Sequence, residues 1–569
     1  MVTKTSLIYA AAILSGIVTV IVFLPTVHFD FLYWDDDLYL FNNAAIRSLD
    51  LNLLSWAFGP NKFGFPITWV SFALDYHFWG LNPCGFHLTN VLLHGLTAGL
   101  AVLLAFRLIR LTPSYLNADR NGHSPGRGTT AIFVSLATGL LYALHPLRVE
   151  SVAWIAERKD VLSVFFGFSA MLSYLRYVQC RMQQGAASKM GAPVWYVATL
   201  ALFILAVNSK AMLVMLPAVF MIMDWYPLQR LNGMREFFLS LREKIPFLVI
   251  SCVVAIRTFI IYAPSADDLQ LIPPLSSRIL VACKAVVKYL LLIAWPDRLS
   301  PLYLYSKNAS LGDPIYVISL IAVVVITFGA LFVVRRTRAL LAVWLFFLVT
   351  LLPYVGVLQT GIEGMADRFT YLASFAPTLL ICSLAGLLWE PRSRLKVIKR
   401  VARPVIVVVA AAAIMASVLA TRNLLPVWKN TETLWSRVIA LEPDNIGRAY
   451  YERALYYLRQ KDYPKALVDL NKSVEIAQKK NFLWSGKLFF VRGNTYMMLG
   501  KLPKAIDDFT LALSYPPEKE LGYSTIFRSR SECWRAAGRD DMARRDIESA
   551  EAIEKTLSEG RPEQKSDQH

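Results

Sequence analysis

The chain has 569 residues, of which 56% are hydrophobic and only 18% are charged, whereas soluble domains average about 45–50% apolar and about 25% charged residues. This composition excludes a disordered protein and a nucleic-acid scaffold. Lysine and arginine outnumber aspartate and glutamate by 59 to 41, which gives a formal net charge of +18. The 6 cysteines are scattered singly, so they predict neither a disulfide framework nor a zinc site.

Apolar runs of about 20 residues, the length of a membrane-spanning helix, recur along the first three quarters of the chain. They predict eleven spans, at 6–24, 88–108, 129–145, 160–178, 194–208, 211–227, 245–263, 314–334, 339–356, 370–389 and 403–421. The first run follows Lys4 but has no small-residue cleavage site before Pro25, so we expect a retained anchor rather than a cleaved signal peptide.

Positive residues concentrate in alternate loops between the predicted spans, most densely at 392–400. By the positive-inside rule these loops are cytoplasmic, which places the N-terminus inside and the region after the last span outside. The net positive charge is therefore a signal of topology and not of a nucleic-acid partner.

One apolar segment, 278–295, does not fit a simple span. It carries Arg278, Lys284 and Lys288, and a lysine at the bilayer centre costs about 2.5–3.5 kcal/mol on insertion scales. We expect an amphipathic helix at the outer surface or a re-entrant element.

After the last span the sequence becomes polar and charged, and three segments align on one another: 451–477, 489–513 and 527–552. This pattern resembles tetratricopeptide (TPR) repeats of about 34 residues with a longer connection. It predicts an α-solenoid of about three repeats at 426–557, following the membrane domain at 1–425. Such a stack presents a concave surface to a peptide or partner protein; the alternative is a lid or assembly brace without a groove. The charged tail at 558–569 is expected to be disordered.

An acidic cluster, Asp35, Asp36 and Asp37, follows the first predicted span and is flanked by aromatic residues. Partial burial at a membrane surface raises the proton affinity of a carboxyl, which suits a catalytic base or a metal ligand. The alternative is a helix N-cap with solvated neighbours.

A second polar group follows the third predicted span, in a loop on the same outer side, and contains His145 and Glu150. These two could share a divalent metal with an aspartate, or Glu150 could position an acceptor, although no ligand spacing is diagnostic. The alternative is an interfacial helix held by salt bridges.

Positive charges close to hydrocarbon are costly unless they have a function, and a lipid-linked phosphate is a natural partner for them. The candidates on the outer side are Arg158, Lys159, Lys210, Arg257 and Arg368. Each single side chain could instead snorkel to the interface.

Several motifs, taken in chain order, resemble a known family. They are Phe31-Leu32-Tyr33-Trp34-Asp35-Asp36, Pro66-Ile67-Thr68, Asp75-Tyr76, the run from Phe86 to His94, His145-Pro146, Glu150-Ser151-Val152-Ala153 and the run from Asp367 to Leu372. Together they resemble the transmembrane and tetratricopeptide-repeat-containing O-mannosyltransferases and, more broadly, the integral-membrane glycosyltransferases of the GT-C class. The resemblance covers nearly the whole chain.

The resemblance implies a GT-C-like helix bundle that uses a polyprenyl- or dolichyl-phosphate sugar and an acceptor outside the cytoplasm. By motif position the family's acidic pair falls on Asp35 and Asp36, and the family's later acidic-Arg element on Asp367 and Arg368. Two motifs depart from the family: Phe65 stands where the family has Arg before Pro-Leu-Thr, and Arg148 stands for the second His of His-Pro-x-His. These departures bear on the choice of sugar and acceptor.

The sequence thus predicts an all-α polytopic membrane enzyme that transfers mannose or a similar hexose to a protein Ser or Thr by inverting displacement. We expect a bacterial inner membrane rather than an ER membrane, with the catalytic loops and the repeats on the periplasmic or lumenal side. One rival is a membrane-anchored TPR scaffold without catalysis. The other rival is a transporter. A transporter would carry ionisable groups near mid-membrane, whereas the acidic residues of this sequence concentrate in the predicted outer loops.

Overall fold

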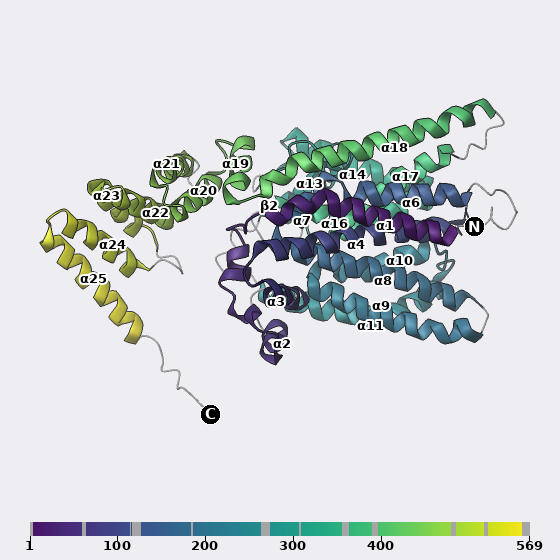
Figure 1. Cartoon of the computed structure of the whole chain (residues 1–569), viewed down its shortest axis with the longest axis horizontal. Helices are drawn as coiled ribbons and strands as arrows, with labels where there is room; N and C mark the ends of the chain where they lie inside the picture. Colours follow the sequence, from purple (N-terminus) through teal and green to yellow (C-terminus); the bar gives the residue numbers. More distant parts are fainter. Residues whose placement is uncertain are drawn as a thin grey trace. The chain divides into compact units, whose positions relative to one another are not determined.

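The computed structural model describes residues 4–59, 64–113, 115, 127–183, 186–262, 273–306, 309–355, 363–389, 396–479, 485–516 and 522–559. The chain divides into two compact units, Met1–Asn430 and Thr431–His569 (Figure 1). Most described residues are helical, which confirms the predicted all-α class. The one sheet in these ranges pairs two short antiparallel strands, β1 (Tyr303–Leu304) and β2 (Glu363–Met365). Of the predicted basic loop at 392–400, residues 392–395 lie outside the described residues and 396–400 are helical. Of the predicted tail at 558–569, residues 558 and 559 are helical and the rest lie outside the described residues.

The first unit is a helix bundle. Its helices are α1 (Lys4–Phe23), α2 (Leu51–Phe58), α3 (Pro66–Trp79), α4 (Pro83–Arg110), α6 (Arg127–Ala143), α7 (Val149–Ala153), α8 (Arg158–Met182), α9 (Ala186–Ser209), α10 (Leu216–Trp225), α11 (Met234–Ile261), α13 (Leu275–Ala294), α14 (Pro314–Val333), α15 (Ala339–Leu351), α16 (Thr370–Ala373), α17 (Phe375–Trp389) and α18 (Lys396–Leu424).

Among the described residues, 7 helices are long and apolar enough to cross a membrane, or up to 9 if two bent pairs are counted. The bent pairs are Gly128–Ala143 with Pro146–Ala153 and Asp367–Ala373 with Phe375–Leu388. The other two predicted spans, 211–227 and 339–356, fall on shorter apolar helices, Ala211–Trp225 and Ala339–Leu351. The polytopic bundle is therefore confirmed, and each of the eleven predicted segments is helical.

The two bends bring polar residues into the bundle. The first bend is 56°, and it arises at His145 because a residue before proline avoids the helical conformation; His145 has φ −68° and ψ 138°. The second bend is 58°, close to Pro377, which lacks the N–H needed to continue the preceding turn.

Glycines let α1 approach α4 closely. A Cβ on Gly16 would lie 2.9 Å from the carbonyl oxygen of Gly95, and one on Gly99 would lie 3.2 Å from that of Ala12. Small residues at such spacings are typical of packed membrane helices. This packing fixes the start of the loop that carries the acidic cluster.

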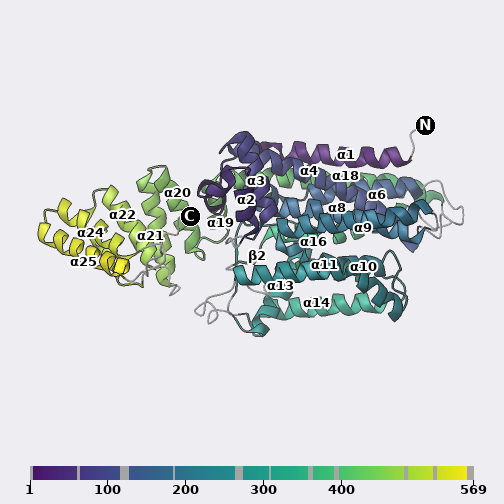
Figure 2. The same cartoon turned by 90° about the horizontal axis from the view of Figure 1, so that it is seen from below.

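The segment predicted at 278–295 forms one uninterrupted amphipathic helix, α13, which lies beside α14 (Figure 2). It buries Val286 and Tyr289 in a cluster shared with α15, while Lys284 lies over the ring of Tyr316 at 5.2 Å. It is not among the candidate spans, as its positive residues predict.

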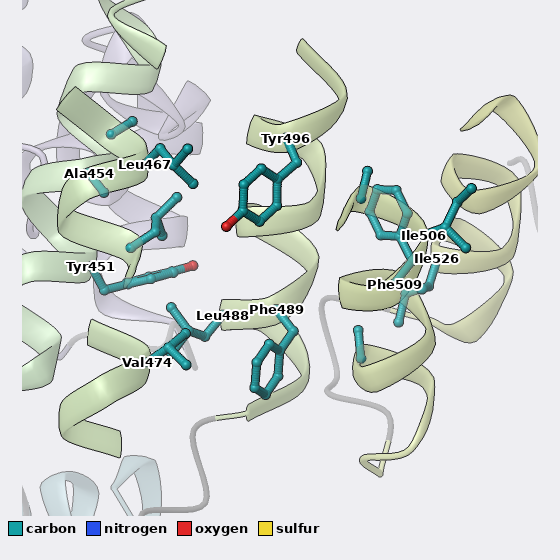
Figure 3. Close-up of a cluster of buried hydrophobic side chains, with 14 of the residues drawn as sticks. Tyr451, Ala454, Leu467, Val474, Leu488, Phe489, Tyr496, Ile506, Phe509 and Ile526 are labelled. Atoms are coloured by element: carbon teal, nitrogen blue, oxygen red, sulfur yellow. The ribbon is translucent and has the colours of Figure 1, made fainter. Parts of the chain in front are cut away.

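The second unit begins with α19 (Thr431–Leu441) and continues as three helix pairs. The pairs are α20 (Gly447–Arg459) with α21 (Tyr463–Lys479), α22 (Ser485–Met498) with α23 (Leu502–Leu513), and α24 (Tyr523–Ala536) with α25 (Asp540–Glu559). One hydrophobic cluster runs through the pairs, from Tyr451 and Leu467 through Tyr496 to Phe509 and Ile526 (Figure 3). Such sharing of a core between neighbours is what stabilises a solenoid.

An ion pair recurs in every helix pair of this unit. An arginine of the first helix binds an aspartate of the second through two nitrogens, with a closest distance of 2.7 Å in each case: Arg453 with Asp469, Arg492 with Asp508 and Arg530 with Asp546. Each arginine also reaches the preceding helix through its third nitrogen, binding Ser436, Asn471 and Thr510 in turn. The repeated arginine therefore fixes both the geometry within a pair and the register between pairs.

We predict that Arg492→Ala loosens this unit. The substitution leaves the carboxylate of Asp508, whose side chain is 4% exposed, without its charged partner, and hydrogen bonds to charged groups contribute about 1.5–3 kcal/mol. Hydrogen exchange of the full chain in detergent should show faster exchange of α22 and α23. Lys479→Ala, which removes an exposed pair with Glu475, is the matched control and should leave exchange unchanged; equal effects would contradict the role of the ion pair.

Candidate active site

Asp36 is fully buried and anchors the loop that follows α1. Its Oδ2 accepts a hydrogen bond from the backbone N–H of Leu32 at 2.8 Å, and its Oδ1 accepts one from that of Ala156 at 2.9 Å. The two bonds close the loop on itself and tie it to the short turn Ile155–Glu157. Burial raises the pKa of Asp36 to about 7, although both backbone donors act in the opposite direction.

Asp35, in contrast, is only partly buried, and within the described part of the chain its carboxylate has no hydrogen-bond or ion-pair partner. Burial raises its pKa above 3.8, while the positive charges of Lys159 and Arg368 lower it and the negative charges of Glu157 and Glu363 raise it. The neighbouring aspartates therefore differ: Asp36 is engaged on both oxygens, and Asp35 is free to accept a proton.

Glu157 lies at the centre of a buried charge cluster near Asp35. One carboxylate oxygen lies 3.1 Å from Nζ of Lys159 and 3.3 Å from Nε of Arg368, and the other lies 3.2 Å from Nζ of Lys210. Lys210 also binds Asp160 at 2.6 Å. Three of the five predicted phosphate-binding residues, Lys159, Lys210 and Arg368, thus meet on one glutamate.

The two bent helix pairs are joined across this cluster. The backbone N–H of Arg368 donates to Glu150 at 2.9 Å, and its guanidinium binds Glu150 and Glu363. Arg148 is also fully buried, and its Nη2 donates to the hydroxyls of Thr370 and Ser374 at 2.7 and 3.1 Å. Glu150 and Arg148 therefore hold the 145–153 segment against the 367–374 segment.

The remaining predicted residues lie in other networks. Arg158 is fully buried and binds Asp75 at 2.6 Å and the carbonyl oxygen of Phe86 at 2.7 Å. Arg257 donates to the carbonyl oxygens of Ala57 and Gly59 at 3.4 and 3.2 Å. Neither arginine is brought into the charge cluster, and both serve to fix loops and helix ends.

His145 and Glu150 do not fit the predicted metal site. One ring nitrogen of His145 contacts the carbonyl oxygen of Ile293 at 3.2 Å, and the other accepts from the backbone N–H of Leu147 at 3.3 Å, while Arg368 occupies both oxygens of Glu150. In the described ranges no three His, Cys, Asp or Glu side chains could hold one metal ion. We therefore derive no step through a metal.

Sequence reasoning missed two partners in the site. Glu363, the first residue of β2, binds Arg368, which lies five residues later in the chain. Tyr39 lies with its hydroxyl 3.4 Å from Nζ of Lys159. The aromatic residues around the acidic cluster were a signal for Tyr39, whereas no motif in the sequence indicated Glu363.

Asp36→Ala should lower the thermal stability of the full chain in detergent. It leaves the backbone N–H groups of Leu32 and Ala156 without acceptors in a buried place, and each unsatisfied donor costs about 1–3 kcal/mol. Asp35→Ala is the matched control, because it removes no hydrogen bond, and it should leave the midpoint unchanged. Equal losses for the two variants would contradict the assignment of Asp36 as the anchor of the loop.

The chain is similar to several curated protein O-mannosyl-transferases. It is 30% identical to tmtc2 of Xenopus laevis over 181 residues, which are 30% of this chain and 19% of that protein. It is 32% identical over 126 residues to TMTC4 of Homo sapiens, covering 22% of this chain and 16% of that protein. Tmtc1 of Drosophila melanogaster is 34% identical over 113 residues, covering 20% of this chain and 11% of that protein.

The matched stretch is therefore less than a fifth of the length of these relatives. No protein-family model and no solved structure matches the chain. Over the matched stretch, the chain resembles the transmembrane and tetratricopeptide-repeat-containing O-mannosyl-transferases, as its motifs indicate.

Proposed function

We propose that this protein is a multi-pass membrane glycosyltransferase. It transfers mannose or a similar hexose from a polyprenyl- or dolichyl-phosphate to a hydroxyl group, with protein Ser or Thr as the acceptor. The similarity to protein O-mannosyl-transferases supports the class of reaction. The observation that supports this site is that, among the described residues, the carboxylate of Asp35 has no hydrogen-bond or ion-pair partner, and that a buried cluster of charged side chains lies near it.

The proposed reaction is a single inverting displacement with Asp35 as base. Asp35 takes the proton of the acceptor hydroxyl, and the oxygen forms a bond to the anomeric carbon. The bond between that carbon and the phosphate oxygen breaks, and the lipid phosphate leaves with the electron pair. Asp36 acts as a positioning residue, because its two backbone hydrogen bonds hold the adjacent Asp35 in place.

Lys159 is the best candidate contact for the departing phosphate. It pairs with one carboxylate, that of Glu157, whereas Lys210 pairs with two and Arg368 with three. Its charge is thus the least neutralised of the three, and a nearby cation stabilises negative charge that develops on a leaving group. Arg158 and Arg257 are not assigned to the phosphate, since their hydrogen bonds lie elsewhere.

The topology that suits this reaction has the loop of Asp35 and the second unit on the outer side of the membrane, periplasmic in a bacterial inner membrane. The second unit would then offer its stacked helices to the acceptor polypeptide. A scaffold without catalysis is the competing function, and it requires no intact carboxylate at position 35.

Asp35→Asn should abolish transfer of sugar from a polyprenyl-phosphate sugar to an acceptor peptide. A positioned base contributes about 10²–10⁴-fold to the rate, so we expect a loss of that size in purified, folded protein. Asp37→Asn is the control, because the carboxylate of Asp37 accepts from the N–H of the adjacent Leu38 at 2.9 Å and has no other partner among the described residues, and it should retain activity. Full activity of the Asp35 variant would contradict the assignment of Asp35 as the base, whereas absence of transfer by the wild-type protein would favour the scaffold.

The pH dependence of transfer should also reflect Asp35. The base works only when deprotonated, so the rate should fall as the pH is lowered through its pKa. Because burial raises that pKa, the fall should begin above the range of an ordinary aspartate. The measurement is kcat against pH for the wild-type protein, and a rate that stays constant down to about pH 4, the ordinary pKa of aspartate, would count against Asp35 as the base.

A further inference from the structure

Three tryptophans from distant parts of the chain stack beside Asp35. The rings of Trp34 and Trp154 lie 4.7 Å apart at an interplanar angle of 21°, and those of Trp154 and Trp428 lie 5.8 Å apart at 27°. Trp34 directly precedes Asp35, Trp154 directly precedes the turn that holds Asp36, and Trp428 ends the short turn Leu425–Trp428 after α18. Trp154 and Trp428 are 1% and 3% exposed.

The segment that carries Trp428 is itself fastened to the same region. The backbone N–H of Asp30 donates to the carbonyl oxygen of Lys429 at 2.9 Å. Thr421 donates to the carbonyl oxygen of Leu144 at 2.8 Å, and Arg422 donates to that of Val22 at 3.3 Å. The end of the last span therefore contacts both loops that build the site.

Trp154 stays buried at an energetic disadvantage. In the described part of the chain its indole N–H has no hydrogen-bond partner, and a buried unsatisfied donor is destabilising. Stacked aromatic pairs add stability beyond the area that they bury. Besides the cations Lys159 and Arg368, which lie over the ring at 6.0 and 5.5 Å, the ring is held by two stacked neighbours, one on the loop of Asp35 and one on the segment after α18.

We propose that Trp428 is a positioning residue for the catalytic aspartate, an inference that rests on the proposed function. Trp428 stacks on Trp154, Trp154 stacks on Trp34, and Trp34 directly precedes Asp35, so the stack orients Asp35. Asp36 fixes the backbone of the loop, but in the described part of the chain the side chain of Asp35 has no hydrogen-bond or ion-pair partner of its own. Its direction therefore depends on the backbone from which it extends, and Trp34 is the residue directly before it in that backbone. The final span and its exit segment are therefore part of the active site and not only a connection to the second unit.

The test compares Trp428→Ala with Trp428→Phe in the full chain. A displacement of about 1 Å in a reacting group can reduce a rate about 10²-fold, so Trp428→Ala should lower kcat by about ten- to a hundredfold while leaving the KM for the lipid-linked sugar unchanged. Trp428→Phe keeps a ring in the stack and should restore most of kcat. Trp295→Ala is the control, because Trp295 is 78% exposed.

Near-ultraviolet circular dichroism provides a readout that does not depend on activity. Stacked indoles give a coupled signal. Trp428→Ala should lower this signal by more than Trp428→Phe does, because only the Ala variant should also disturb the pair of Trp34 and Trp154, and the thermal midpoint of the Phe variant should stay at the wild-type value. The lower signal of Trp428→Ala together with wild-type kcat would overturn the inference. So would a failure of Trp428→Phe to recover activity when it is folded as well as the wild type.

These outcomes are distinct from a failure of the proposed function. If the wild-type protein shows no transfer, the proposed function is wrong, and if Asp35→Asn transfers sugar as well as the wild type, the assignment of Asp35 as base is wrong, whatever the tryptophan variants do. If Asp35→Asn is inactive and Trp428→Ala is fully active, only the inference on Trp428 is wrong.

Discussion

The candidate site at Asp35 depends on the two hydrogen bonds that the carboxylate of Asp36 accepts. Its two oxygens accept hydrogen bonds from Leu32 in the first loop and from Ala156 in the turn before α8. A buried carboxylate must be hydrogen-bonded to be tolerated, and here its partners belong to segments separated by more than a hundred residues of chain. Satisfying one buried charge therefore brings the loop of Asp35 onto the cluster around Glu157.

The buried charge cluster around Glu157 is likewise stabilised by pairing of its polar groups. Glu157, Lys159, Lys210 and Arg368 are all nearly inaccessible to solvent, and buried charges persist only when they are paired. Every cation in it has a carboxylate partner, so the charges of the cluster are largely balanced. Lys159 pairs with one carboxylate, whereas Lys210 pairs with two and Arg368 with three, so the charge of Lys159 is the least neutralised.

The second unit is stabilised in a different way from the helix bundle. Its helices are too polar to form a large apolar core, and the repeated arginine–aspartate pairs supplement the shared cluster of Tyr451, Tyr496 and Phe509. Each arginine bonds within its pair and to the preceding helix. In a solenoid each helix pair contacts the adjacent pairs, and the interfaces between pairs contribute to stability. The arginine therefore contributes both within each pair and at the interface with the preceding helix.

By itself the sequence determined the all-α class, the apolar segments, the three repeated helix pairs and the acidic loop. These depend on composition and on local periodicity, which a single sequence contains. It could not distinguish Asp35 from Asp36, exclude Arg158 and Arg257 from the cluster, or bring Glu150 and Glu157 to Arg368. Only the tertiary structure decided these points, because each depends on which backbone group or carboxylate from a distant part of the chain comes within hydrogen-bond distance.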